Sequence, residues 1–395
     1  MSRDALPTPA PARRLPPFTD EHDELRDSIR RFVAAELTPN ADAWEDAHHF
    51  PDSVFPKLAE HGFLGLKYPE SLGGQGGDHL HDAVFTEELA RCGSGGLAAG
   101  IGAHVGIATP PVFTFGTGDQ HERYLRPAIA GTTIGALGIT EPDAGSDVAG
   151  IRTRAQKVDG GWVVNGSKMF ITNGVRAGFM VTAVKTKDTD PPARHGGISF
   201  LIVDTDQEGF AAQPIEKMGW HASDTALIAL QDVFVPEENL LGGLNEGFKL
   251  IMANFQWERL LMALGAVAAM EAAFEKTLQF VKERTAFGRP IGKFQVNRHA
   301  MAEIATTIEA DRALTYHALR LFHDGHDATR EVTIAKLATQ RDCFDVMDRC
   351  LQLHGGAGYM KEYGIERAAR DARLGPIGGG TDEIMREILG RQMGL

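Results

Sequence analysis

Three consecutive glycines followed by a threonine are the part of this sequence whose residue types and spacing most clearly suit chemistry. Gly378, Gly379 and Gly380 lie between two stretches of helical periodicity, and Thr381 directly precedes the second stretch. A glycine lets the backbone approach a ligand closely or adopt a positive φ, and threonine is a favoured helix N-cap. The spacing predicts a helix N-terminus directed at a flat or anionic ligand. For the glycines alone, a flexible loop between helices is an equal alternative.

Two further strings combine small, hydroxyl and aromatic residues in a way that suits a polar ring system. Residues 138–147 read GITEPDAGSD and can surround a ring edge or a pyrophosphate, although any four of them would also suit a surface turn. Residues 168–174 read KMFITNG, in which the two-residue period of a strand places Phe170 and Thr172 on one face. An aromatic ring and a hydroxyl would then face a common neighbour.

The composition narrows the classes of protein that could carry these strings. With 43% hydrophobic and 24% charged residues, the chain of 395 residues is long enough for two or three domains of an ordinary soluble protein. A net charge of −13 and the absence of a Lys/Arg block argue against a nucleic-acid partner. Three cysteines without metal-ligand spacing suggest neither disulfides nor a metal site, and they favour a reducing, cytoplasmic location.

We expect no targeting or membrane segment. Residues 1–18 are rich in Pro and Ala, lack an apolar core and are interpreted as a disordered tail. We find no run of 18 or more apolar residues, so we expect no stable membrane insertion.

The hydrophobic period divides the chain into an α part, a β part and a second α part. Helical spacing dominates residues 19–131, and residues 132–241 follow period two, with β-branched runs at 162–164, 179–184 and 198–203. Helical spacing returns after 242, in stretches at 246–284, 293–323, 328–354, 363–373 and 381–391, which is typical of a helical bundle. The predicted fold class is α+β, with domains at 19–131, 132–241 and 242–395.

Taken together, the strings resemble the acyl-CoA dehydrogenase family. Residues 138–147, 168–174, ERTAFGR at 283–289 and QLHGGAGY at 352–359 occur in the family's order and spacing, and the resemblance runs from about Thr19 to the C-terminus. It implies the acyl-CoA dehydrogenase fold: an N-terminal all-α domain, a middle β-barrel-like domain and a C-terminal four-helix bundle. It also implies non-covalent FAD between the β domain and the bundle, with flavin N5 as hydride acceptor.

The resemblance assigns cofactor positions residue by residue. Residues 137–146 resemble the loop that contacts the flavin ring and pyrophosphate, and Phe170, often Trp in the family, resembles with Thr172 the pair beside the ring. Arg284, Phe287 and Gln295 match positions that hold the adenine-diphosphate end of the FAD of a neighbouring subunit, which implies a homo-oligomer, a dimer of dimers. The expected cofactor-binding residues are Leu137, Gly138, Ile139, Thr140, Gly145, Ser146, Phe170, Ile171, Thr172, Arg284, Phe287, Phe294, Gln295, Gln352, Leu353, Gly355, Gly356, Thr381 and Glu383.

The glycine run stands where many family members carry their catalytic base, a Glu within a Tyr-Glu-Gly-Thr string. Residues 255–260, FQWERL, instead resemble the long-chain and isovaleryl-type members, whose Glu lies on the first helix of the bundle. We therefore assign Glu258 as the base, because burial beside an acyl chain and a flavin would raise its pKa. Gly379 would leave room for Glu258 and donate its N–H to the thioester oxygen. The residues expected at the substrate are Ser146, Gln256, Arg259 and Gly380.

The predicted function is FAD-dependent α,β-dehydrogenation of a fatty or branched-chain acyl-CoA to the trans-2-enoyl-CoA in β-oxidation, with electrons passed to an electron-transfer flavoprotein. One alternative is a same-fold flavoenzyme acting on a carrier-protein-bound acyl group or another non-CoA substrate. A second is a non-catalytic flavin-binding scaffold that lost its base at Gly379. A run of small residues suggests a roomy acyl pocket or, equally, close helix packing: Gly95, Gly96, Ala98, Ala99, Gly100 and Gly102.

Overall fold

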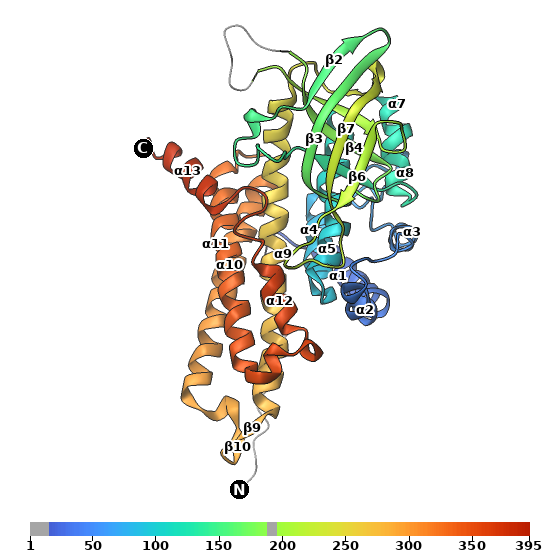
Figure 1. Cartoon of the computed structure of the whole chain (residues 1–395). Helices are drawn as coiled ribbons and strands as arrows, with labels where there is room; N and C mark the ends of the chain where they lie inside the picture. The colour runs from blue at the N-terminus through green and yellow to red at the C-terminus, as the bar shows by residue number, and fades with distance from the viewer. Residues whose placement is uncertain (1–15, 188–195) are drawn as a thin grey trace.

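The chain forms a sheet and two groups of helices that pack along one long helix, α9 (Figure 1). The computed structural model describes residues 16–187 and 196–395, so most of the predicted N-terminal tail lies outside the described residues. The C-terminal helices form an elongated body, the sheet lies beside its upper half, and the first helices lie below the sheet (Figure 1). The predicted order of α, β and α parts is confirmed.

The N-terminal part consists of short helices around a shared apolar core. Phe50, Phe55, Leu58 and Leu97 are fully buried in it. A π-helical turn at His104–Ala108 joins α5 to α6. The helices are α1 (Asp20–Phe32), α2 (Ala41–Asp46), α3 (Val54–Glu60), α4 (His79–Leu89), α5 (Gly95–Ala103), α6 (Thr109–Phe115), α7 (Gly118–Gln120) and α8 (Arg126–Ile129).

The middle part is a mostly antiparallel eight-stranded sheet in the order β6-β7-β3-β2-β4-β5-β8, with β1 parallel to β4. The three β-branched runs fall in β3, β4 and β5, as predicted. Gly160, with φ +71°, makes the turn between β2 and β3, and Asn173, with φ +62°, lies in the turn after β3. The strands are β1 (Gly135–Gly138), β2 (Arg154–Val158), β3 (Gly161–Thr172), β4 (Phe179–Lys185), β5 (Ile198–Asp204), β6 (Phe210–Pro214), β7 (Thr225–Pro236) and β8 (Leu240–Leu241).

The C-terminal part contains three long helices and two shorter ones, each within a few residues of its predicted bounds. They are α9 (Gly247–Glu283), α10 (Gln295–His323), α11 (Thr329–His354), α12 (Ile365–Ala372) and α13 (Asp382–Gln392). A small hairpin, β9 (Thr285–Ala286) and β10 (Arg289–Pro290), connects α9 to α10 at the lower end of the body (Figure 1). Helix α9 also packs against α4 and β5, so it contacts all three parts.

One helical stretch, Gly95–Phe115, is long and apolar enough to cross a membrane by length and composition. The expectation concerned an uninterrupted apolar run, and His104, Thr109 and Thr114 interrupt this stretch, which passes on mean hydropathy because of its Ala, Val, Ile, Leu and Phe side chains. Most of this stretch is buried inside the protein, and the core helix of a soluble protein passes the same test.

The small residues of α5 mainly serve close packing. A Cβ on Gly96 would lie 2.7 Å from the Trp220 carbonyl carbon, and one on Gly100 would lie 2.7 Å from the Phe50 ring. Gly102 differs, because a Cβ there would meet nothing within 4 Å. Of the two interpretations of this run, helix packing explains Gly96 and Gly100, and only Gly102 faces open space.

Replacing Gly96 by Ala is expected to lower the free energy of unfolding by about 1–3 kcal/mol, because the added methyl group overlaps the Trp220 backbone. Gly102→Ala, on the same helix, is the matched control and is expected to be neutral or to stabilise by up to about 1 kcal/mol, since alanine is the better helix former. Urea denaturation measures both values. Equal stability of the two variants would contradict this packing.

Candidate active site

Glu258 is a buried carboxylate in the first third of α9. It is 8% exposed, and Asn254, one helical turn earlier, donates from Nδ2 to its Oε1 at 2.5 Å. Burial raises the pKa of Glu258 to about 7, although Arg259 and the Asn254 hydrogen bond oppose the shift. A carboxylate with this pKa can accept a proton near neutral pH. Asn254 was missed in the sequence, but its i, i+4 spacing from Glu258 was a usable signal.

The glycine run lies against the same face of α9. Gly379 and Gly380 have φ values of +62° and +96°, which favour glycine. A Cβ on Gly379 would overlap the sulfur of Met262, and Met262 is one turn beyond Glu258. The expectation that Gly379 leaves room directly for Glu258 is therefore corrected: its immediate neighbour is Met262.

Arg259 connects α9 to the glycine run. Its Nε donates to the Gly379 carbonyl oxygen at 3.3 Å, and its guanidinium lies 5.4 Å from the centre of the Phe255 ring. The side chain is only 8% exposed, and this burial lowers the pKa of Arg259, while Glu258 opposes the shift. Arg259 thus contacts the backbone of the glycine run, and its expected place at the substrate stays a prediction.

Thr381 caps the last helix as predicted. Its Oγ1 accepts a hydrogen bond from the Ile384 N–H at 3.3 Å, and α13 begins at the next residue. Glu383, in the first turn of α13, is exposed and forms an ion pair with Arg386 at 3.1 Å. The glycine run therefore leads into a capped helix N-terminus.

The strings at 138–147 and 168–174 are joined by buried polar contacts. Lys168 is fully buried and donates from Nζ to Glu141 Oε1 at 2.7 Å and to the Ile139 carbonyl at 3.1 Å. The Thr140 hydroxyl donates from Oγ1 to the Met169 carbonyl at 2.6 Å. The Thr140 backbone carbonyl accepts from the Met169 N–H at 2.9 Å. The expected flavin-facing segments thus form one unit, and neither buried ion was recognised in the sequence.

A bulge in β3 changes how Phe170 and Thr172 are presented. The register with β7 shifts between Met169 and Ile171, and Phe170 has a φ of +62°. The bulge interrupts the two-residue alternation just before Phe170, but the burial of Ile171 between the exposed Phe170 and the half-buried Thr172 agrees with the predicted common face of these two residues. Phe170 is 61% exposed while Ile171 is buried, so the bulge displays the aromatic ring on the surface.

The other expected flavin residues near this unit lie along one segment. Leu137 and Gly138 end β1, Ile139 and Thr140 follow it, and Gly145 and Ser146 are exposed in the next loop.

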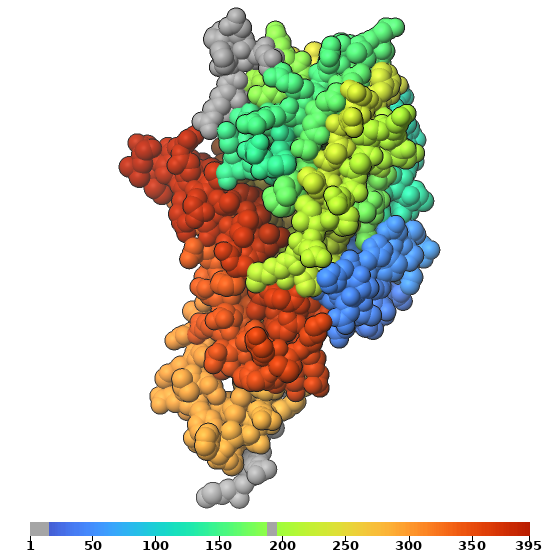
Figure 2. Space-filling view, in the orientation of Figure 1, coloured from blue at the N-terminus to red at the C-terminus, as the bar shows by residue number. Residues whose placement is uncertain are grey.

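The remaining expected cofactor residues lie at the opposite end of the bundle. The hairpin region forms the lower end of the molecule, away from the sheet (Figures 1 and 2). His354 stacks on Phe280 of α9 with ring centres 4.3 Å apart, which places the end of α11 beside this region. Phe287 is 94% exposed. The residues concerned are Arg284, Phe287, Phe294, Gln295, Gln352, Leu353, Gly355 and Gly356, and one chain does not bring them to the flavin-facing strings.

Gln256 is engaged away from the carboxylate. Its Nε2 donates to Thr329 Oγ1 at 2.5 Å, at the start of α11. Its assignment to the substrate, like that of Ser146 and Gly380, stays a prediction.

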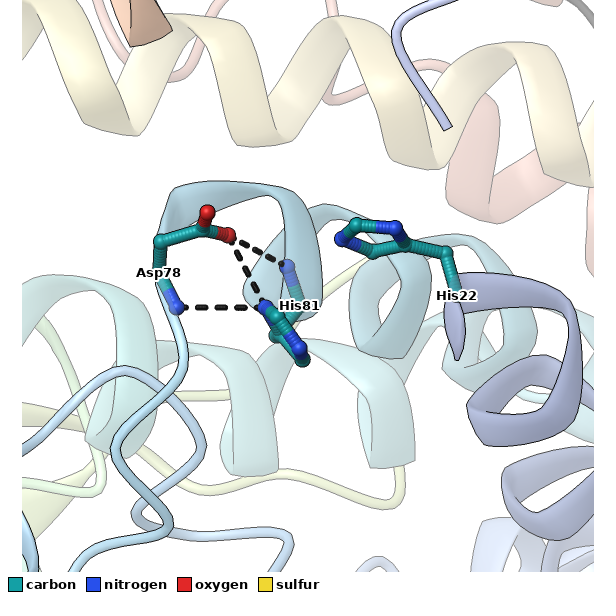
Figure 3. A group of neighbouring side chains, drawn as sticks. All are labelled: His22, Asp78 and His81. Carbon is teal, nitrogen blue, oxygen red and sulfur yellow. Dashed lines mark hydrogen bonds and ion pairs between the residues drawn. The ribbon is translucent and has the colours of Figure 1, made fainter. Parts of the chain in front are cut away.

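His22, Asp78 and His81 form a cluster that the sequence did not suggest, because its members come from two helices (Figure 3). Each histidine occupies the third position of its helix: His22 Nδ1 accepts from the Thr19 N–H at 3.2 Å, and His81 Nδ1 from the Asp78 N–H at 3.1 Å. Asp78 Oδ1 accepts from the Leu80 N–H at 2.8 Å. These are capping contacts that satisfy helix N-termini, and they account for the cluster without a metal.

The residues present fit FAD. The bulge displays an aromatic ring beside a threonine, the loop at 145–146 is open, and a Cβ on Gly145, Gly355 or Gly356 would meet nothing within 4 Å. Such exposed glycine and aromatic surfaces suit a flat ring system and a diphosphate. The fold and this site define a flavoprotein dehydrogenase in which a buried carboxylate lies on the helix that contacts the glycine loop.

The chain belongs to the acyl-CoA dehydrogenase family. Three family models match: "Acyl-CoA dehydrogenase, N-terminal domain" at 19–132, "middle domain" at 136–233 and "C-terminal domain" at 245–394. It is 40% identical to the long-chain specific acyl-CoA dehydrogenase of Mus musculus over 95% of this chain and 87% of the relative. It is 35% identical to the isovaleryl-CoA dehydrogenase of Solanum tuberosum over 95% and 91%. The predicted fold and flavin-dependent oxidoreductase class are confirmed.

Solved structures agree with this assignment. A probable acyl-CoA dehydrogenase from Mycobacterium abscessus matches with a TM-score of 0.92 and 41% identity, over 95% of this chain and 99% of that one. A glutaryl-CoA dehydrogenase from Mycobacterium smegmatis, solved with FADH2, matches with a TM-score of 0.89 and 26% identity, over 95% of both chains. Members of the family bind FAD, which confirms the predicted cofactor.

Replacing Glu258 by Gln is expected to stabilise the protein at about pH 8, by up to about 3 kcal/mol, because ionising the buried carboxyl costs free energy. The pKa of Glu258 is raised from 4.5 to about 7 by folding, so the wild type loses this stability as pH rises through that interval. Urea unfolding of both proteins with saturating FAD, at about pH 5 and about pH 8, measures the difference. It should fall to about 1 kcal/mol or less at the lower pH.

The matched control is Glu275→Gln, on the exposed surface of the same helix, where the carboxylate pairs with Arg91. That variant should show no such stabilisation at high pH. The burial argument would fail if both variants responded to pH alike.

Proposed function

We propose that the protein removes two hydrogens from Cα and Cβ of a fatty or branched-chain acyl-CoA, with Glu258 as the α-proton base. The observation that carries the proposal is a desolvated carboxylate on α9, one turn from the point where the glycine run contacts Met262 and where the positive φ of Gly379 disfavours a side chain. A base on α9 and a vacant late position occur together, as the resemblance to long-chain and isovaleryl-type members implies.

The chain's own residues carry the proton step. Bound FAD supplies the acceptor for the β-hydrogen and its electron pair. Asn254 engages Oε1 of Glu258, so we assign the α-proton to Oε2. The low polarity around Glu258 keeps its pKa near the range in which it can both accept and release a proton.

The thioester oxygen needs donors as negative charge develops on it. We assign the Gly379 N–H to this role, because Arg259 holds the Gly379 carbonyl and thereby fixes the local backbone. A preorganised backbone donor stabilises such charge more than a mobile one does.

The alternatives differ in substrate or in activity. A carrier-bound or other non-CoA substrate is compatible with the same base. A non-catalytic scaffold is disfavoured by the buried, proton-accepting Glu258, since an uncompensated buried carboxylate is destabilising without a function. We also propose an electron-transfer flavoprotein as electron acceptor, on the family resemblance alone.

Glu258→Gln is expected to keep its FAD absorbance and to lose at least about 100-fold in the rate of anaerobic flavin bleaching, because the base is removed. The measurement is a stopped-flow titration with acyl-CoAs of graded length and branching, with Glu275→Gln as control. In the wild type, kcat/KM should fall as pH drops below about 7, since the base becomes protonated.

Unchanged bleaching in Glu258→Gln would overturn the base assignment. Absence of bleaching by every acyl-CoA in the wild type would favour a non-CoA substrate. A wild-type protein that binds no flavin would exclude the proposed enzyme.

We further propose that the active form is a homo-oligomer in which the hairpin end of one subunit contacts the FAD of another. The supporting observation is the distance, visible in Figure 1, between the sheet and the hairpin end, together with the near-complete exposure of Phe287. An exposed aromatic of this size usually marks a contact surface when other apolar residues accompany it. Val296 and Tyr359, 73% and 78% exposed, do so.

Phe287→Ala is expected to weaken FAD binding by about tenfold, because it removes aromatic contact with a cofactor held by another subunit. Flavin content and sedimentation, measured over a range of protein concentrations, test this. Phe234→Ala, an exposed aromatic on β7, is the control. A monomer that retains its full flavin would contradict the shared site.

A further inference from the structure

Lys336 is a fully buried lysine in the first half of α11. Its Nζ donates to the carbonyl oxygens of Gly375, at 3.0 Å, and Gly380, at 2.6 Å. Removing an ammonium group from water is costly, so these contacts must compensate much of that cost. Both acceptors lie in the segment between α12 and α13 that contains Gly379.

Two further residues of α11 contact the segments around the glycine run. Gln340, one turn after Lys336, donates to the Met262 carbonyl at 2.7 Å, and its side chain occupies the space where a Cβ on Gly375 would lie. Arg341 donates to Asp382 Oδ2 at 3.0 Å, at the start of α13. Helix α11 therefore contacts both ends of the glycine segment and also the part of α9 that faces it.

Two cations from two helices bind the backbone of this segment. Lys336 binds the Gly375 and Gly380 carbonyls from α11, and Arg259 binds the Gly379 carbonyl from α9. Glycines at positive φ have a large choice of conformations, and fixing them costs conformational entropy. Charged donors on three carbonyls select one conformation and offset that cost.

We propose that Lys336 is a positioning residue, which holds the 375–380 backbone so that the Gly379 N–H stays directed at the thioester oxygen while Glu258 faces Cα. This rests on the function proposed above. Lys336 itself contacts neither substrate nor FAD in this arrangement. Its effect passes through the loop conformation, so its loss should affect substrates that carry the carbonyl oxygen more than analogues that lack it.

The test compares Lys336→Met with the wild type as FAD holoenzymes. Methionine keeps the apolar stem and removes the donors. Three quantities are measured: hydrogen–deuterium exchange of residues 375–383, the anaerobic rate of flavin reduction by the best acyl-CoA, and the Kd of the corresponding thioether, in which CH2 replaces the carbonyl. Arg330→Met, an exposed cation on the same helix, is the control.

For Lys336→Met we expect exchange in 375–383 to rise about tenfold, flavin reduction to slow about 10–100-fold and the thioether Kd to stay within about twofold. Lys336→Gln, which keeps one donor group, should lie between Met and the wild type, and it carries the test if Lys336→Met does not fold. The control should resemble the wild type in all three.

Unchanged exchange in 375–383 would overturn the proposal, and so would an equal loss of thioester turnover and thioether affinity, since that pattern indicates general loosening. If no acyl-CoA reduces the wild-type flavin, the proposed function fails, but the exchange measurement still decides whether Lys336 holds the loop.

Discussion

The desolvation of one carboxylate is the constraint on which the rest of the site depends. Glu258 is 8% exposed and has Asn254 and Arg259 as polar neighbours. A carboxyl group in this setting keeps a raised pKa only while water is excluded and no closer cation neutralises it. The glycine run approaches α9 one turn beyond Glu258, where a Cβ on Gly379 would overlap the Met262 sulfur. The positive φ of Gly379 also favours glycine there.

The proposed base, Glu258, lies on α9, the most extensively packed element of the fold. The helix of 37 residues contacts the N-terminal helices, the sheet and the rest of the bundle. A side chain on such a helix is held more accurately than one on a loop. The glycine segment then needs external support, which comes from Arg259 on α9 and Lys336 on α11. The proposed base is therefore positioned by α9 itself, whereas the glycine segment is positioned by side chains from α9 and α11.

The cofactor surfaces divide between the two ends of the molecule. The Lys168–Glu141 ion pair joins the strings beside the sheet, while Phe287 projects at the hairpin end. A chain that separates surfaces expected to bind one ligand requires a second copy to bring them together. Quaternary structure would then be a condition of cofactor binding, which accounts for exposed aromatic residues far from the sheet.

Features that depend on neighbouring residues were predictable from the sequence. The bounds of α9 to α13, the Thr381 cap and the turn at Gly160 follow from local periodicity, capping and glycine conformation. The assignment of Glu258 as the base rests on the motif at 255–260 and stays a prediction. The tertiary structure alone decided that the β3 bulge exposes Phe170, that Met262 fills the space before Gly379 and that α5 glycines serve packing.

The partners of the buried lysines were also decided by the tertiary structure alone. Lys336 and Gly380 are 44 residues apart, and Lys168 and Glu141 are 27 apart. Each lysine lies in an ordinary helix or strand pattern, so no local period distinguishes it from a surface cation. Such a contact is selected by the free energy of satisfying a buried charge, which depends on what the fold brings near it and not on the residues beside it in the chain.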